Sequence, residues 1–124
     1  MKVNTIMRPP RAILGPHTSV ADALAKIQEH KVGGLPVLDP HGLLMGMATT
    51  ESLSASRSDK ALMDITQRLA PILITATPDM DVGRVIEMMD YKHLRNIMVV
   101  EGRTLVGAFS IDEARAALQI ARAA

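Results

Sequence analysis

The stretch Leu35-Pro36-Val37-Leu38-Asp39 has a counterpart in Ile97-Met98-Val99-Val100-Glu101, at an offset of 62 in the numbering. Each stretch is a short aliphatic run, typical of a buried β-strand, and each is followed by a turn that contains glycine. A second aliphatic run follows the turn in both places, at 44–49 and at 105–110. Two apolar runs separated by a short glycine-containing turn predict a β-hairpin, so the sequence predicts two related hairpins.

A helix is expected before each hairpin and another after it. Apolar residues recur at the i, i+3, i+4, i+7 spacing from Val20 and again from Val82, which predicts a helix with one apolar face in each place. A serine and an aspartate, both typical N-cap residues, precede these two helices at the same offset of 62. After the hairpins we expect a short polar helix from about Thr50 and a long helix over 111–122.

An apolar strand is also expected at the start of each copy, at 12–14 and at 72–74. The repeated unit is therefore β-α-β-β-α, and one such unit is too small to bury an adequate core alone. We expect an α+β fold of α/β-type repeats, in which two pseudo-symmetric units pack sheet to sheet and leave a cleft between them. The polar linker places the first domain, with the N-terminal segment, at 1–57, and the second, with the linker and the C-terminal helix, at 58–124.

The composition argues against several classes of protein. The 124 residues contain no cysteine, which excludes a disulfide scaffold and a thiolate metal site. Fourteen basic residues balance thirteen acidic ones, and the aromatic residues are Tyr91 and Phe109 alone, so a nucleic-acid-binding surface is not expected. The sequence shows no apolar run of membrane-spanning length and no secretory signal pattern. We therefore expect a cytoplasmic protein whose partners are neither nucleic acids nor membranes.

The motifs of enzymes and metal centres are also missing from the sequence. The four histidines show no metal-binding spacing, and neither a nucleophile elbow nor a phosphate-binding loop occurs. No pair of titratable residues stands at a spacing that demands chemistry. We therefore expect a protein that is not an enzyme, with no catalytic residue, no metal and no resident cofactor.

The most suggestive polar residues fall where each hairpin should lead into its second helix. Ser110 and Thr49 lie at these strand-to-helix junctions, and Glu113 and Ser52 follow them by one helical turn. Such a spacing brings the two members of a pair to the same face. In the second copy, the hydroxyl could then meet a phosphate at the helix N-terminus while the carboxylate meets a ribose. The same spacing is that of a capping box, and both interpretations stay open because one serine can do both.

These residues resemble the signature of the cystathionine β-synthase (CBS) domain, a regulatory module normally found in pairs. The signature is an apolar strand ending in Pro-Val, a turn with Asp and Gly, and then Gly-x-x-Thr/Ser-x-x-Asp before the second helix. The first copy matches it over 35–53 and the second over 94–114, and the resemblance covers nearly the whole chain.

The resemblance implies an adenine-containing ligand (AMP, ADP, ATP or S-adenosylmethionine) in the cleft between the units. In the family, the closing Asp holds the ribose hydroxyls; this chain has Glu113 there in the second copy and Ser52 in the first, so the second site is expected to be the better one. The resemblance also places Arg95 near a phosphate, although a solvated turn charge is an equal alternative. The adenine would lie on the aliphatic strands, with backbone groups near Ile74 and Ile97 at its edge.

The residues expected at the ligand are Ser110, Glu113, Asp112, Arg95, Asn96, Ile97, Met98 and Ile74 in the second copy, and Thr49, Ser52, Leu35, Pro36 and Ile13 in the first.

The function implied is that of a stand-alone regulatory module that signals the bound ligand to another protein, which the sequence does not identify. In the family such pairs form flat homodimers, and the apolar helix faces here also predict a homodimer through helices. The alternative is a structural dimerisation module with a degenerate nucleotide site, because Ser52 and Met98 both depart from the signature.

Overall fold

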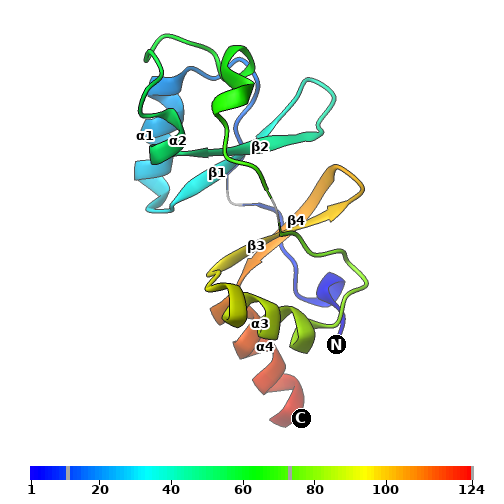
Figure 1. Ribbon diagram of the computed structural model, residues 1–124. Helices are drawn as coiled ribbons and strands as arrows, with labels where there is room; N and C mark the ends of the chain where they lie inside the picture. The colour runs from blue at the N-terminus through cyan, green and yellow to red at the C-terminus, as the bar shows by residue number, and fades with distance from the viewer. Residues whose placement is uncertain (11, 73, 124) are drawn as a thin grey trace. The chain divides into compact units, whose positions relative to one another are not determined.

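The computed structural model describes residues 1–10, 12–72 and 74–123 (Figure 1). The chain divides into two compact units: unit 1 comprises Met1–Pro10 and Ile74–Ala124, and unit 2 comprises Arg11–Leu73. The limits of these units differ from the domain boundary that the sequence places between positions 57 and 58. The N-terminal segment packs with the second repeat, whereas the segment after the linker packs with the first.

Unit 2 contains the predicted helix, hairpin and short second helix. Its elements are α1 (Val20–His30), β1 (Gly34–Leu38), β2 (Leu44–Thr49) and α2 (Thr50–Leu53), followed by the 3₁₀ helix η2 (Leu62–Arg68). Strands β1 and β2 pair antiparallel, as the sequence predicts (Figure 1).

Unit 1 repeats this order with a longer second helix. Its elements are the 3₁₀ helix η1 (Val3–Thr5), α3 (Val82–Lys92), β3 (Asn96–Glu101), β4 (Thr104–Ser110) and α4 (Ile111–Ala123). Strands β3 and β4 also pair antiparallel. The predicted α+β class and the tandem repeat of helix, hairpin and helix are therefore confirmed.

Each hairpin is extended by a single-residue bridge at either edge. In unit 2, Leu14 pairs parallel with Val37, and Ala70 pairs antiparallel with Met47 on the opposite strand. The strand predicted at 12–14 is thus reduced to one paired residue, because the chain turns away after Leu14.

The bridges of unit 1 stand at the equivalent places. Ala76 pairs parallel with Val99, and Arg8 pairs antiparallel with Ala108. The strand predicted at 72–74 is displaced, since the paired residue is Ala76, the counterpart of Leu14 at the offset of 62. Leu73 lies outside the described residues.

The first helix of each unit is held at both ends by matching residues. Ser19 and Asp81 act as N-caps, and each side chain accepts a hydrogen bond from a backbone N–H in the first turn, at 3.1 and 3.2 Å. Lys31 and His93 end the two helices in the left-handed conformation, with φ of 54° and 58°. Both pairs repeat at the offset of 62 that relates the hairpins.

We call residues 1–10 of unit 1 and residues 60–72 of unit 2 the lead-in segments. They dock alike: Val3 N donates to Met80 O at 2.9 Å, and Leu62 N donates to Thr18 O at 2.9 Å. Both Val3 and Leu62 are fully buried in the core of their unit. The core of each unit therefore includes a segment that lies outside its helix, hairpin and second helix.

Two glycines allow the lead-in segments to approach the hairpins closely. A Cβ atom on Gly107 would lie 3.1 Å from the Cβ of Met7, and one on Gly46 would lie 3.1 Å from the Cβ of Leu69 and from the carbonyl oxygen of Ala70. Separations this short are tighter than ordinary van der Waals contact. The repeated glycine of β2 and β4 therefore serves the packing of the lead-in segments.

Each unit has its own core, formed where the helix faces cover the hairpin. Members of the unit 1 core include Val3, Met89, Val99, Phe109 and Ala114. Members of the unit 2 core include Leu14, Ala23, Val37, Leu53 and Leu62.

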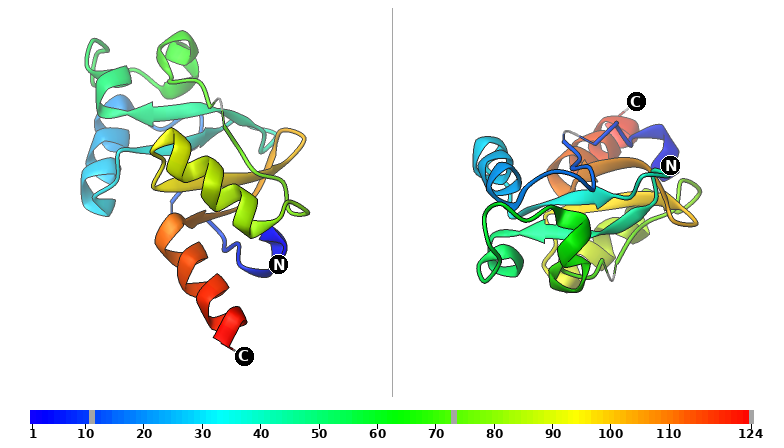
Figure 2. Two further views of the ribbon diagram at one scale, coloured as in Figure 1. Left: turned by 60° about the horizontal axis from the view of Figure 1, so that its bottom comes forward. Right: turned by 90° about the horizontal axis from the view of Figure 1, so that it is seen from above.

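The end of α4 projects beyond the other elements of unit 1 (Figures 1 and 2). Residues 119–123 are all exposed, and Ile120 exposes 72% of its surface. Among the described residues, no helix is long and apolar enough to cross a membrane. A cytoplasmic location stays a prediction.

Candidate functional site

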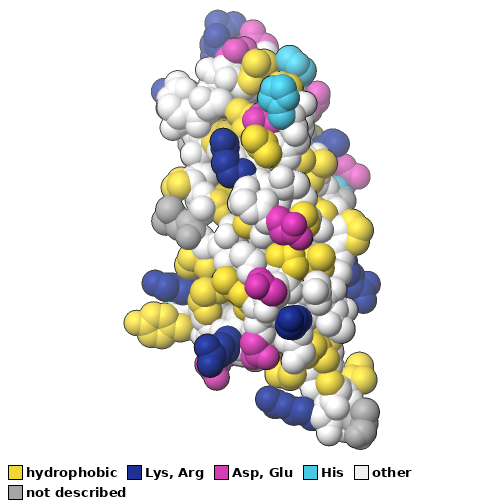
Figure 3. Space-filling model, turned by 90° about the vertical axis from the view of Figure 1, so that its right-hand side faces the viewer, with side chains coloured by type: hydrophobic (Ala, Val, Ile, Leu, Met, Phe, Trp, Pro, Cys, Tyr) yellow, Lys and Arg dark blue, Asp and Glu magenta, His cyan; other side chains and the backbone are white. Residues whose placement is uncertain are grey.

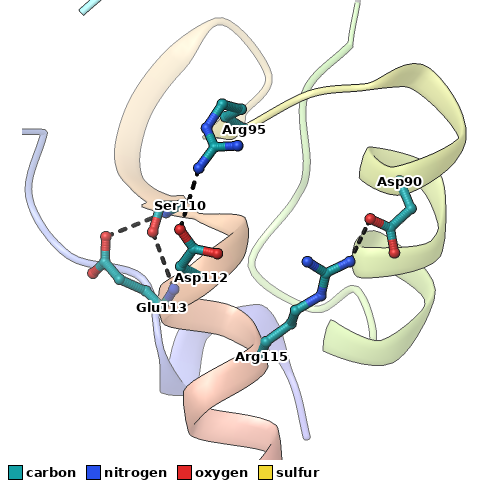
Figure 4. Close-up of polar contacts among 6 residues, drawn as sticks. All are labelled: Asp90, Arg95, Ser110, Asp112, Glu113 and Arg115. Carbon is teal, nitrogen blue, oxygen red and sulfur yellow. Dashed lines mark hydrogen bonds and ion pairs between the residues drawn. The ribbon is translucent and has the colours of Figure 1, made fainter.

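The junction between β4 and α4 brings the predicted pair Ser110 and Glu113 together (Figure 4). Glu113 N donates to Ser110 Oγ at 3.0 Å, and Ser110 N donates to Glu113 Oε1 at 3.3 Å. This reciprocal pair of hydrogen bonds is a capping box. The capping interpretation is therefore confirmed, while a ligand contact by the same residues stays a prediction.

The second oxygen of the Glu113 carboxylate faces the lead-in segment. Glu113 Oε2 lies 3.4 Å from Nε of Arg8, whose side chain is 77% exposed against 32% for Glu113. Sequence reasoning missed Arg8, because this residue lies far from Glu113 in the sequence and outside the repeated hairpin. One sequence signal was available: Arg8-Pro9 and Ala70-Pro71 are related by the same offset of 62, which indicates that the repeat extends to the segment that contains Arg8.

Arg95 and Asp112 form a second charged pair at the same junction (Figure 4). Arg95 Nη2 lies 3.4 Å from Asp112 Oδ2, and the two side chains are 79% and 73% exposed. The backbone is fixed more firmly, because Ile111 N donates to the carbonyl oxygen of Arg95 at 2.9 Å. An ion pair this exposed contributes little to stability, so both side chains can exchange partners.

In unit 2 the equivalent capping pair is uncharged, and Glu51 is the acidic residue of the first turn, at the position of Asp112. Ser52 N donates to Thr49 Oγ1 and Thr49 N donates to Ser52 Oγ, both at 2.9 Å. The hydroxyl of Ser52 also donates to the carbonyl oxygen of Thr49 at 3.1 Å. The two predicted residues thus meet, but the hydroxyl proton of Ser52 is engaged within the cap.

Several of the predicted aliphatic residues face the cores. The side chains of Leu35 and Ile97 are only 5% and 3% exposed and belong to the cores of units 2 and 1. Pro36 is buried as well. These three residues therefore offer little accessible surface to a ligand.

The remaining predicted residues are accessible to different degrees. Asn96 and Ile13 are exposed, whereas Ile74 and Met98 are half-buried. Ile74 packs against the core of unit 1, and Met98 lies in β3, where its carbonyl oxygen accepts a hydrogen bond of 2.9 Å from Ala76 N. Their part in binding stays a prediction.

Two further features of unit 1 were not predicted. Arg115 is hydrogen-bonded to Asp90 and so ties α4 to α3 (Figure 4). An open hollow of about 630 Å³ lies along α3, lined by Met80, Val85 and Met88 with Asp81 and Arg84. None of the predicted site residues lines it.

The charges of the molecule are mixed in sign. Figure 3 shows basic, acidic and hydrophobic side chains interspersed over the face that it draws. In the part of the chain that the structure describes, no three His, Cys, Asp or Glu residues come together as a metal site would require.

A family model described as "CBS domain" matches the chain twice, over residues 3–57 and 64–120. Among curated proteins, the chain is similar to the CBS domain-containing protein YhcV of Bacillus subtilis. The two are 21% identical over 105 residues, which is 82% of this chain and 74% of that protein.

Two solved structures illustrate the similarity of the fold. The crystal structure of CBSX2 in complex with AMP has a TM-score of 0.73 and 26% identity, and the match covers 97% of this chain and 98% of the other. The CBS domain pair of protein MJ0100, in complex with 5′-methylthioadenosine and S-adenosyl-L-methionine, has a TM-score of 0.70 and 22% identity, and the match covers 98% of each chain.

Proposed function

This chain belongs to the CBS-domain family, with two copies of the domain in tandem, and from that premise we propose that it is a regulatory module that binds an adenine-containing ligand. The candidate ligands are AMP, ADP, ATP and S-adenosylmethionine. The observation that carries the proposal is the start of α4, where a hydroxyl, two carboxylates and the arginine paired with each carboxylate gather around one helical turn. The similarity to CBSX2 in complex with AMP supports the choice of ligand.

The capping box at the start of α4 leaves both of its side chains able to bind a ligand. Ser110 Oγ accepts a hydrogen bond from Glu113 N, but a hydroxyl also has one proton to donate, which a phosphate oxygen can accept. Glu113 Oε1 accepts from the backbone, and Oε2 can accept from a ribose hydroxyl once Arg8 moves aside. Capping therefore orients these two side chains without consuming their capacity to bind.

Regulation follows if the ligand binds one arrangement of the protein better than another. A ligand can shift a conformational equilibrium only by its difference in affinity for the two states. We propose that the shift is read by a second protein and that the module acts as a homodimer through its helices. The location of the ligand between the two repeats stays a prediction.

Titration with the four candidate ligands tests the proposal. We expect at least one of them to release or absorb heat in calorimetry and to raise the melting temperature. A ligand at about 100 times its Kd stabilises the folded chain by about 2.7 kcal/mol. No heat and no thermal shift with any of the four at millimolar concentration would contradict the proposal.

The Glu113→Gln variant separates capping from binding. A glutamine oxygen can still accept the hydrogen bond from Ser110 N, so the melting temperature should change little. The negative charge is lost, and we expect the affinity for the nucleotide to fall by about 1.5–3 kcal/mol, the range for a hydrogen bond to a charged group. Calorimetry of both proteins measures the difference.

The matched control is Glu87→Gln, which makes the same chemical change on the exposed surface of α3. It should leave the nucleotide affinity unchanged. Equal affinities of the Glu113→Gln variant and the wild type would mean that the carboxylate serves only the cap.

A structural dimerisation module is the second candidate function, and the completeness of the two caps favours it. Both junctions complete their reciprocal capping hydrogen bonds without a ligand. Tyr91 on α3 and Ile120 on α4 are also 80% and 72% exposed, and a partner helix in a dimer could cover them. A stable dimer in analytical ultracentrifugation, together with no response to any candidate ligand, would select this alternative.

A further inference from the structure

A charged residue bridges β4 in unit 1, and an uncharged residue bridges β2 in unit 2: these are Arg8 and Ala70. Arg8 and Ala108 exchange backbone hydrogen bonds of 3.0 and 2.8 Å, and Ala70 and Met47 exchange two of 2.8 Å. The backbone is thus held in the same way at both places. An arginine side chain in unit 1 consequently stands where unit 2 has only a methyl group.

The capping residue in the first turn of the second helix is likewise charged in unit 1 and uncharged in unit 2. Unit 1 has Glu113, whose carboxylate contacts Arg8, and unit 2 has the neutral Ser52 at the equivalent position. Arg95 likewise corresponds to Gly33 at the offset of 62. Both members of the Arg8–Glu113 ion pair, and the arginine that pairs with Asp112, therefore occur in unit 1 and not at the matching positions of unit 2.

The Arg8 side chain is free to change partners although its backbone is fixed. Its Nε lies 3.4 Å from Glu113 Oε2, and 77% of the side chain is exposed. An ion pair with this exposure adds little to stability, so the guanidinium can leave Glu113 at small cost. A phosphate monoester is a stronger partner, because it carries about 1.5 to 2 negative charges at neutral pH, against one on the carboxylate, and can accept two parallel hydrogen bonds from the guanidinium in place of the single contact with Glu113.

We infer that Arg8 is a specificity-determining residue, which directs unit 1 toward an anionic ribonucleotide that carries a phosphate beside a ribose diol. In the free protein, Arg8 and Glu113 form an ion pair through one contact of 3.4 Å. A nucleotide replaces that one contact by two, since its ribose hydroxyls donate to Glu113 and its phosphate accepts from Arg8. This inference rests on the proposed function and narrows it to one class of ligand and one site per chain.

Ligands that lack the phosphate should bind less well for a defined reason. Adenosine can occupy Glu113 only by displacing Arg8, which then has no anion to bind. S-Adenosylmethionine has the same ribose but carries a positive sulfonium where the nucleotide has a phosphate, so it offers Arg8 no phosphate beside the ribose in exchange for Glu113. The expected order of affinity is therefore AMP above adenosine and S-adenosylmethionine.

Calorimetry with AMP, adenosine and S-adenosylmethionine on the full chain tests this inference. Wild-type protein should bind one AMP per chain. The Arg8→Ala variant should bind AMP about 10- to 100-fold more weakly, the range for losing a charge-assisted hydrogen bond. The affinity of this variant for adenosine should be equal to or higher than that of the wild type, because no arginine then pairs with Glu113. Arg103→Ala, which removes an exposed arginine from the turn between β3 and β4, should change neither affinity.

The outcomes separate this inference from the proposed function. Equal weakening of AMP and adenosine by Arg8→Ala would overturn the phosphate contact and assign Arg8 a structural role. Unchanged AMP affinity in the variant, tighter wild-type binding of S-adenosylmethionine than of AMP, or two equal AMP sites per chain would also overturn it, while ligand binding itself would stand. If the wild type binds none of these three compounds and neither ADP nor ATP, both the inference and the proposed function fail.

Discussion

Replacing Phe109 with alanine is expected to lower the free energy of unfolding by about 3–5 kcal/mol, the usual range when a buried phenylalanine is truncated. Phe109 is 3% exposed and lies in the core of unit 1, on β4 opposite Ile97. Its removal would leave a cavity in that core, which the well-packed surroundings can close only in part. Chemical denaturation followed by circular dichroism measures the loss.

The chain supplies a matched aromatic control in Tyr91. This residue lies on α3 in the same unit but is 80% exposed, with its ring beside the Lys92 ammonium at 5.5 Å. Tyr91→Ala should therefore change the stability by no more than about 0.5 kcal/mol. Similar losses for the two variants would show that the core of unit 1 is not built around β4 as described.

The hairpins and the helices before them could be predicted because their signals are local and occur twice. A continuous aliphatic run such as 97–100 indicates a buried strand, and the spacing from Val82 indicates an amphipathic helix. Each of these signals has an equivalent in the other half of the chain, at an offset of 61 or 62. The structure confirms both hairpins, with the shorter turn in the second, and the unequal lengths of α2 and α4.

The edge bridges and the lead-in segments could not be predicted in the same way. A one-residue bridge such as that of Ala76 with Val99 has no periodicity of its own, so the apolar run at 72–74 is the stronger signal although it lies too early. The burial of Val3 in unit 1 depends on contacts with residues far along the chain, beginning with Met80, which no local pattern reveals.

The candidate site shows the same limit. The spacing of Ser110 and Glu113 places both residues on one turn, as the structure has them, because a helix fixes that geometry. The sequence could not show that Arg8 faces Glu113, since the contact depends on the docking of the lead-in segment. It also could not tell that the side chain of Ile97 faces the core, because both faces of a short aliphatic strand look alike in the sequence.

The docking of the second lead-in segment leads to an equally specific expectation for Leu62. This residue is fully buried in the core of unit 2, and its backbone N–H donates to the carbonyl oxygen of Thr18 at 2.9 Å. Leu62→Ala should lower the free energy of unfolding by about 2–5 kcal/mol, as for other buried leucines. The neighbouring Met63 is 41% exposed, and Met63→Ala should cost well under half as much, since much of its side chain already lies in solvent.

Hydrogen exchange identifies which unit loses stability in the Leu62→Ala variant. Leu62 follows the polar linker, so the sequence boundary assigns it to the second domain, whereas the packing assigns it to unit 2. Faster exchange should therefore appear first in the amides of α1 and β1, because local opening follows the loss of core contacts. A first response in the amides of α3 and β3 would contradict the assignment of residues 60–72 to unit 2. Equal stability of the Leu62→Ala and Met63→Ala variants would contradict it as well.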